Sequence, residues 1–162
     1  MTTMTKKDIV ITRTFDAPRE LVWRAWTDPK YFALWWGPKA FTAPHVEIDF
    51  RVGGIYRNCM RGPGLNGVTT DFWSTGVYKE IKPFERIVSS DSFADKDGNV
   101  VPPSYYGMPG DWPLELTVEV TFEEYGGKTM MTLRHAGIPE EMIGECATGW
   151  SESLDKLEES LK

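Results

Sequence analysis

Residues 139–162 read PEEMIGECATGWSESLDKLEESLK, and this stretch decides the fold. Its apolar side chains recur at spacings of three and four, which places them on one stripe of a long helix. The stripe consists of Met142, Ile143, Cys146, Trp150, Leu154, Leu157 and Leu161. Most positions between them are acidic, and Pro139 followed by two glutamates suits the first turn of a helix. A helix with one long apolar side needs a large apolar partner surface.

The sequence upstream supplies that surface as a series of strands. In residues 114–123 apolar and polar side chains alternate without exception, which is the period of a strand with one buried face. We predict strands at 9–15, 46–51, 55–61, 71–81, 86–93, 114–123 and 129–135, and short helices at 19–27 and 30–35. Short turns between successive strands favour antiparallel pairing. The sequence therefore predicts one α+β domain over residues 1–162, in which the long C-terminal helix lies across a curved antiparallel sheet of six to seven strands.

Composition excludes several classes of function. The formal net charge is −6, and seven acids against two lysines in residues 139–162 account for most of it. This distribution argues against nucleic-acid binding, which requires a basic surface. No apolar run approaches the ~18 residues of a membrane span, and no signal peptide is visible. The two cysteines, Cys59 and Cys146, have no metal or redox spacing. We expect a cytoplasmic protein with free thiols and no integral membrane contact.

Several motifs, in this order, resemble the START-like (SRPBCC) superfamily. They are PRELVWRAWTDP at 18–29, WWGP at 35–38, DFRVGG at 49–54, GVYKEI at 76–81 and GWSESLDKL at 149–157. Within that superfamily the chain is similar to stand-alone bacterial proteins related to the C-terminal domain of the heat-shock-protein-90 ATPase activator. The resemblance implies a helix-grip fold with a deep cavity between the sheet and the last helix. Relatives use this cavity for lipids, sterols or polyketides, and a minority catalyse reactions there.

The chain is rich in aromatic residues, with seven tryptophans, six tyrosines and eight phenylalanines. A cavity lined by such rings and a few polar groups is typical of a small-molecule site. On strand 55–61, alternation points Tyr56, Asn58 and Met60 inward, because the opposite parity contains two arginines. The predicted ligand-binding residues are Trp36, Tyr56, Asn58, Met60, Trp73, Phe93, Tyr106, Met142, Cys146 and Trp150. For any one of these rings, simple filling of the core is an equal alternative.

Other features favour structural roles. His45 and His135 lack neighbours at metal-ligand spacing, so we expect structural or surface roles for both. Residues 95–99, DKDGN, depart from the calcium-binding loop pattern and predict a polar turn. We therefore predict no metal, no cofactor and no catalytic residue. The aromatic segment 104–113 predicts either a lid over the cavity or a satellite of the core, and it leaves a homodimer through this loop or a sheet edge open.

Three functions compete at this point. We prefer non-enzymatic binding of a small hydrophobic or aromatic molecule, lipid-like or polyketide-like. Regulation of a chaperone ATPase, with a role in stress response, follows from the resemblance alone. We favour it less, because the activator has a further N-terminal domain and only eight residues precede the first strand here. An enzyme acting on an aromatic or polyketide-like substrate requires a titratable group in the cavity, and alternation places none there. A structure with Asp111 or His135 pointing into the cavity would reverse this preference in favour of the enzyme.

Overall fold

The computed structural model describes residues 6–64 and 66–162, in which seven strands form an antiparallel sheet. The strands are β1 (Lys6–Phe15), β2 (Thr42–Ile48), β3 (Ile55–Pro63), β4 (Thr69–Lys82), β5 (Arg86–Ala94), β6 (Leu116–Tyr125) and β7 (Lys128–Pro139). Their order is β1-β7-β6-β5-β4-β3-β2, so β1 and β2 are the edges. Consecutive strands from β2 to β7 are neighbours, and β1 pairs with β7. The predicted antiparallel sheet is confirmed.

Three α-helices and two 3₁₀ turns complete the described fold. They are α1 (Arg19–Thr27), α2 (Pro29–Phe32), η1 (Pro103–Tyr106), η2 (Glu140–Met142) and α3 (Ile143–Ser160). The second short helix, predicted over 30–35, is correct in kind but ends earlier, because the backbone after Phe32 continues in turns. The C-terminal helix begins with one 3₁₀ turn before its α-helical part. None of the described helices is long and apolar enough to cross a membrane.

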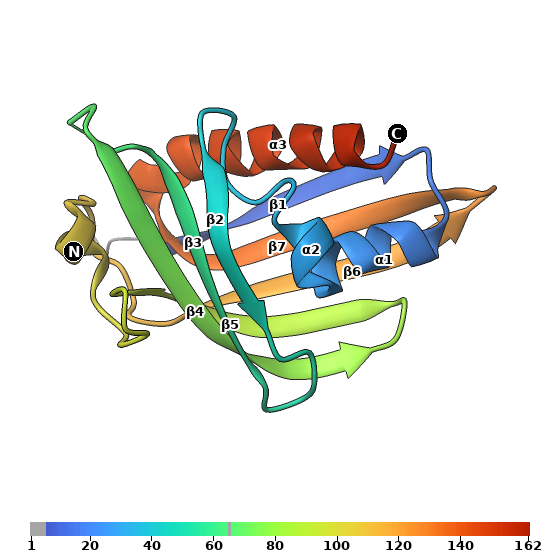
Figure 1. Cartoon of the computed structure of the whole chain (residues 1–162), viewed down its shortest axis with the longest axis horizontal. Helices are drawn as coiled ribbons and strands as arrows, with labels where there is room; N and C mark the ends of the chain where they lie inside the picture. Colours follow the sequence, from blue (N-terminus) through green and yellow to red (C-terminus); the bar gives the residue numbers. More distant parts are fainter. Residues whose placement is uncertain (1–5, 65) are drawn as a thin grey trace.

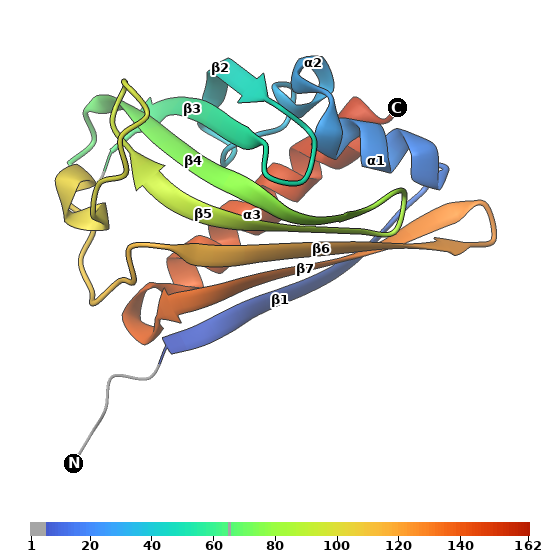
Figure 2. The same ribbon diagram turned by 90° about the horizontal axis from the view of Figure 1, so that it is seen from below.

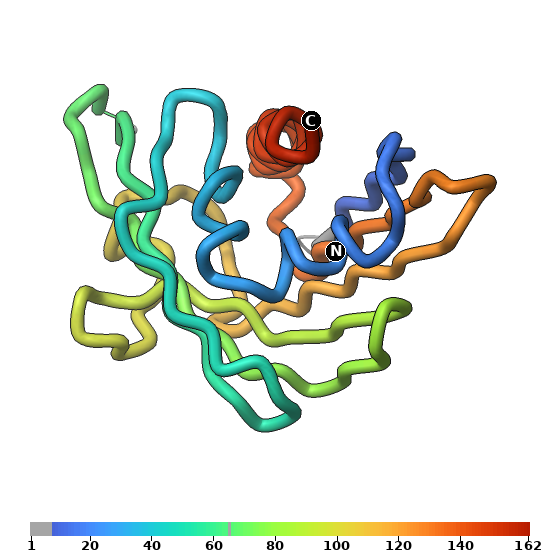
Figure 3. The backbone as a smooth tube through the Cα atoms, turned by 45° about the vertical axis from the view of Figure 1, so that its right-hand side comes forward, coloured from blue at the N-terminus to red at the C-terminus, as the bar shows by residue number. Residues whose placement is uncertain are grey.

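The sheet curls around α3, which lies along its concave side (Figures 1 and 3). Helices α1 and α2 lie beside the C-terminal half of α3, whereas the segment between β5 and β6 lies near its N-terminal end (Figures 1 and 2). Leu154 and Leu157 of α3 are fully buried, as are Phe15, Val22 and Leu133 from the surrounding elements. This is the α+β helix-grip architecture that the sequence predicts, with the two short helices directly after β1.

Glycine at position 76 permits a close approach between β3, β4 and β5. A Cβ on Gly76 would lie 2.0 Å from the Ser90 carbonyl oxygen and 2.4 Å from the Tyr56 ring. The absence of a side chain therefore lets the Tyr56 ring lie over β4 on the concave side. Pairing of β4 with β5 is also irregular between Tyr78 and Glu80. Tyr56 is buried there and lines a small recess of the concave side.

Candidate functional site: a cavity beneath the N-terminal half of the last helix

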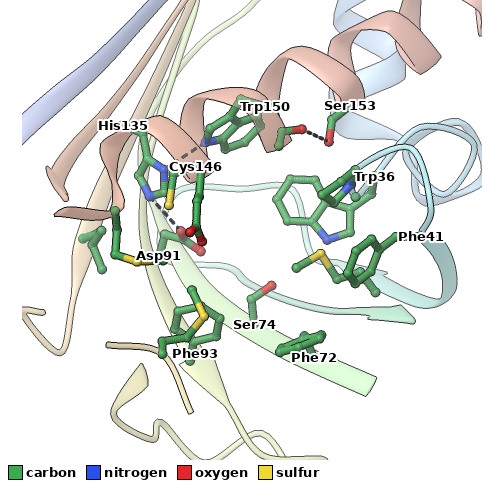
Figure 4. Close-up of a pocket in the computed structure, with 18 of the residues that line it drawn as sticks. Trp36, Phe41, Phe72, Ser74, Asp91, Phe93, His135, Cys146, Trp150 and Ser153 are labelled. Atoms are coloured by element: carbon green, nitrogen blue, oxygen red, sulfur yellow. Dashed lines mark hydrogen bonds and ion pairs between the residues drawn. The ribbon is translucent and has the colours of Figure 1, made fainter. Parts of the chain in front are cut away.

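A cavity of about 320 Å³ lies between the N-terminal half of α3 and the concave face of the sheet. This volume is at the lower end of the ~300–1,000 Å³ usual for small-molecule sites. Aromatic rings from several parts of the chain form its walls (Figure 4): Trp36, Phe41, Phe72, Phe93 and Trp150. The exposed lining is strongly apolar, with a few polar groups among the rings. Such a lining favours the burial of an apolar guest.

The wall next to α2 is held to α3 by hydrogen bonds. Lys156 Nζ donates to the carbonyl oxygens of Pro38 and Phe41, at 3.2 and 3.0 Å. Partial burial lowers the pKa of this lysine from its usual value, and the charge of Glu152 opposes the shift. Both carbonyl oxygens belong to the segment after α2 that lines the cavity. The bonds therefore fix the position of the Phe41 wall relative to the helix.

Polar groups at one side of the cavity form a connected cluster (Figure 4). The Trp150 indole N–H donates to His135 Nδ1 at 2.9 Å. His135 Nε2 lies 3.1 Å from Asp91 Oδ2, although the N–H is not aligned well enough with this oxygen for a hydrogen bond. The Tyr56 hydroxyl donates to Asp91 Oδ1 at 2.9 Å. Side chains from three strands thus meet at Asp91, and α3 joins the cluster through the bond from Trp150 to His135.

The hydrogen bonds of this cluster assign the donor and the acceptor in each pair. An indole N–H can only donate, so His135 Nδ1 accepts from Trp150, and His135 Nε2 is the ring nitrogen that faces Asp91. Burial, and next the Asp91 carboxylate, raise the pKa of the Tyr56 hydroxyl well above its usual value. Tyr56 is therefore a neutral donor to Asp91 Oδ1.

A small recess adjoins the main cavity, and both spaces are lined by Trp36, Asp91 and Trp150. Its volume is about 40 Å³. Asn58 and Ser89 contribute polar side chains to it, next to Tyr56. Asn58 is 1 % exposed, and its Oδ1 has no hydrogen-bond partner in the described part of the chain. The recess is therefore a mainly apolar extension of the cavity that includes a few polar side chains.

The model for the Activator of Hsp90 ATPase homolog 1-like protein family matches residues 16–162. The chain belongs to this family. The match includes every residue that lines the cavity, from Trp36 to Ser153. No curated protein matches the chain.

Solved structures of three similar proteins have the same fold. Protein CV1439 from Chromobacterium violaceum is 29 % identical, with a TM-score of 0.76, over 95 % of this chain and 96 % of that one. The AHSA1 protein from Silicibacter pomeroyi is 23 % identical, with a TM-score of 0.74, over 96 % and 97 % of the two chains. CalU16 from Micromonospora echinospora is 24 % identical, with a TM-score of 0.65, over 97 % of this chain and 77 % of its own. Because the second and third proteins are less than 25 % identical to this chain, their structures show only that the fold is shared.

In this family member the sequence-predicted site residues fall into three groups. Seven line the main cavity: Trp36, Met60, Trp73, Phe93, Met142, Cys146 and Trp150. Tyr56 and Asn58 line the recess, together with Trp36 and Trp150. Tyr106 lines neither, because its hydroxyl accepts from the Trp73 backbone N–H and donates to the Ala94 carbonyl oxygen. Its ring contacts those of Phe72 and Phe93, on the sheet side of the wall.

The prediction that no acid, base or histidine lines the cavity is wrong. Asp91, His135 and Glu145 all contribute to the lining. The period of two along β7 carries the buried face from Met131 and Leu133 to His135. Similarly, Asp91 stands two residues before Phe93 on β5, so the strand period places both on one face. The alternation that places Asp91 and His135 inward is present in the sequence. On β5 it is difficult to recognise, because polar side chains occupy both faces of the strand.

The aromatic segment between β5 and β6 contributes to the cavity through Met108 and Trp112. The Trp112 indole N–H donates to the Pro109 carbonyl oxygen at 2.7 Å, which fixes the ring within its own segment. By contrast, Tyr105 is 60 % exposed and Asp111 is exposed. The segment thus forms part of the cavity wall and also presents one ring to solvent. Its predicted role as a lid remains a prediction.

Proposed function

We propose that this protein binds a small hydrophobic or aromatic molecule in the cavity between α3 and the sheet. The observation that carries the proposal is a space of about 320 Å³ with a predominantly apolar lining, between the N-terminal half of α3 and the sheet. Burial of apolar surface contributes about 25 cal/mol per Å², so a guest that fills this space gains affinity without charged contacts. Membership of a family with a helix-grip fold is consistent with such a binding domain.

The test is saturable binding together with a variant that fills the cavity. A panel of fatty acids, flavonoids and aromatic polyketides is titrated while tryptophan fluorescence is recorded, because Trp36 and Trp150 line the cavity. Cys146→Phe places a ring in the space and is expected to abolish binding. Thr148→Phe adds the same ring at an exposed position of α3 and is expected to bind as the wild type does. Absence of saturable quenching across the panel, or equal binding by both variants, would overturn the proposal.

A second candidate is proton transfer on a bound aromatic substrate, which the Asp91–His135 pair in the cavity favours. We expected an inward His135 to reverse the preference for binding, and His135 does line the cavity. However, His135 Nδ1 is occupied by Trp150 and Nε2 faces Asp91, so the imidazole is suited to positioning Asp91. Asp91 would then be the base that takes a proton from the substrate. For these reasons we keep binding as the preferred function.

Deuterium exchange distinguishes the two candidates. The α-protons of 1-tetralone, an aryl ketone, are followed by NMR in D₂O in the presence of the wild type and of Asp91→Asn. Catalysis predicts faster exchange with the wild type than with the variant. Equal rates, with both proteins still binding the ketone, would exclude the enzyme and leave the binding function in place.

A further inference from the structure

The ionisable side chains that line the main cavity carry an excess of negative charge. Asp91 and Glu145 belong to the lining, whereas none of its described residues is a lysine or an arginine. Even a protonated His135 would balance only one of the two carboxylates. A cavity of about 320 Å³ thus combines a strongly apolar lining with net negative charge.

The two carboxylates lie at different depths of the cavity and act on the same part of it. Asp91 extends from β5 toward His135, with 19 % of its side chain exposed (Figure 4). Glu145 is an exposed residue in the first turn of α3, so it lies where the cavity reaches solvent. Burial, and then the charges of Glu145 and Asp91, raise the pKa of the Cys146 thiol to about 11. Both negative charges are therefore felt at the place where Cys146 borders the cavity.

Cations elsewhere on the cavity wall do not cancel this charge. Arg57 lies 5.0 Å from the centre of the Trp73 ring, but it pairs with Glu47 at 3.2 Å. Lys156 donates to two backbone carbonyl oxygens of the wall, and the charge of Glu152 acts on it. Neither cation belongs to the lining, and each has a carboxylate of its own nearby. By contrast, Glu145 has no ion pair in the described part of the chain.

Aromatic rings add to the attraction for a cation. Seven of the described lining residues are tryptophan or phenylalanine. The face of such a ring carries negative partial charge, so a cation that lies over it is stabilised. Any ion that leaves water loses its hydration, and only attraction inside the protein offsets this cost. A cation meets that attraction here, whereas an anion meets repulsion from two carboxylates.

We propose that the cavity selects organic cations, in which an ammonium group is attached to an apolar or aromatic body, over carboxylates of the same shape. This inference rests on the proposed binding function and names the class of guest. The apolar body packs against the rings, and the ammonium group lies beside Cys146, within reach of the charges of Asp91 and Glu145. Fatty acids are accordingly expected to be the weakest members of the ligand panel, because each carries a carboxylate.

The experiment compares three probes that share one aromatic body and differ in the terminal group: 2-(1-naphthyl)ethylamine, 2-(1-naphthyl)ethanol and 1-naphthylacetic acid. At neutral pH the first is a cation, the second is uncharged and the third is an anion. Their dissociation constants are measured by isothermal titration calorimetry at about 0.15 M salt, which screens distant surface charges. We expect the amine to bind about tenfold more tightly than the alcohol, and the alcohol about tenfold more tightly than the carboxylate.

Two variants locate the preference. Asp91→Asn and Glu145→Gln each remove one negative charge and nearly keep the shape of the side chain. Each is expected to reduce the preference for the amine over the carboxylate by about threefold or more, while the affinity for the alcohol stays the same and shows that the cavity is intact. Glu158→Gln is the matched control, because it makes the same charge change at an exposed position of α3 outside the lining. In this control the preference is expected to keep its wild-type value.

The outcomes separate this inference from the function on which it rests. If the three probes bind the wild type with equal affinity, or the carboxylate binds most tightly, the selection of cations is overturned and the binding function stands. If the control lowers the preference as much as Asp91→Asn and Glu145→Gln do, the amine responds to the net charge of the protein and the inference is likewise overturned. The same holds if none of the three probes binds while the wider panel does. If the wider panel also fails, the binding function itself is overturned.

Discussion

The two halves of α3 have the same apolar stripe and opposite surroundings. Leu154 and Leu157, in the C-terminal half, are completely buried, and α1 and α2 lie beside this half of the helix (Figure 2). In the N-terminal half, Cys146 and Gly149 border the cavity. Trp150 marks the transition, since its ring lies 6.2 Å from that of Trp26 and also lines the cavity. An apolar stripe on a helix therefore predicts contact with a core, but it does not distinguish solid packing from the wall of a cavity.

The largest expected effect comes from shortening one side chain in each half. Leu157→Ala leaves a cavity in close-packed surroundings and is expected to lower the free energy of unfolding by about 2–5 kcal/mol. Cys146→Ala removes an atom that already borders empty space, so the expected loss is less than about 1 kcal/mol. Urea unfolding of both variants measures the difference. Similar losses in the two variants would contradict the division of α3 into packed and hollow halves.

A smaller effect is expected from adding a methyl group at either of two glycines. In Gly76→Ala the new Cβ meets the Ser90 carbonyl oxygen on the paired strand, which cannot move independently, and the expected cost is about 1–3 kcal/mol. In Gly62→Ala the Cβ comes within 2.5 Å of the Phe41 ring, a side chain with the cavity beside it.

We therefore expect Gly62→Ala to unfold at nearly the wild-type urea concentration but to bind cavity ligands more weakly, because Phe41 moves into the space. Denaturation and ligand titration of the same two variants test this pair. A loss of stability in Gly62→Ala equal to that in Gly76→Ala would show that the Phe41 wall is as rigid as the paired strands.

The fold could be predicted from the sequence because its signals are local and repeated. The alternation from Leu116 to Phe122 and the stripe of α3 each repeat one period several times, and periodicity is the main signal of secondary structure. Strand boundaries were less accurate where no period decides them. The strand predicted at 46–51 is β2, Thr42–Ile48, since Arg51 and Gly54 instead form backbone turns.

The candidate site was only partly predictable, for physical reasons that concern particular residues. Alternation along β3 correctly predicted that Asn58 and Met60 face the concave side of the sheet. The meeting of Asp91, His135 and Trp150 joins residues of β5, β7 and α3, and no local pattern encodes such a distance. The recess depends on Gly76, whose lack of a side chain admits the Tyr56 ring. No local pattern in the sequence indicates the space that results.

The smallest expected effect is on the reactivity of the two cysteine thiols. Cys59 lies in packed surroundings, whereas Cys146 borders the cavity. Burial raises the pKa of both Cys59 and Cys146 from 9.0 to about 11, and nearby carboxylates add to each shift. At pH 8 we expect iodoacetamide to modify both far more slowly than a free cysteine, since the thiolate is the nucleophile. Cys146 borders the cavity and is expected to react as the pH rises, whereas Cys59, 1 % exposed, is expected to react after unfolding.

The same shifts give stability a pH dependence with a defined sign. Each thiol keeps its proton in the folded state at a pH where the unfolded chain has lost it, so its contribution is fully present below pH 9 and is lost as the pH rises towards about 11. Urea midpoints across this range, for the wild type and for Cys59→Ser and Cys146→Ser, measure each contribution. A bound cavity ligand should protect Cys146 from alkylation and leave Cys59 unchanged. If Cys59 in the folded protein reacted as fast as Cys146, the contrast between the packed and hollow regions would not hold at these two positions.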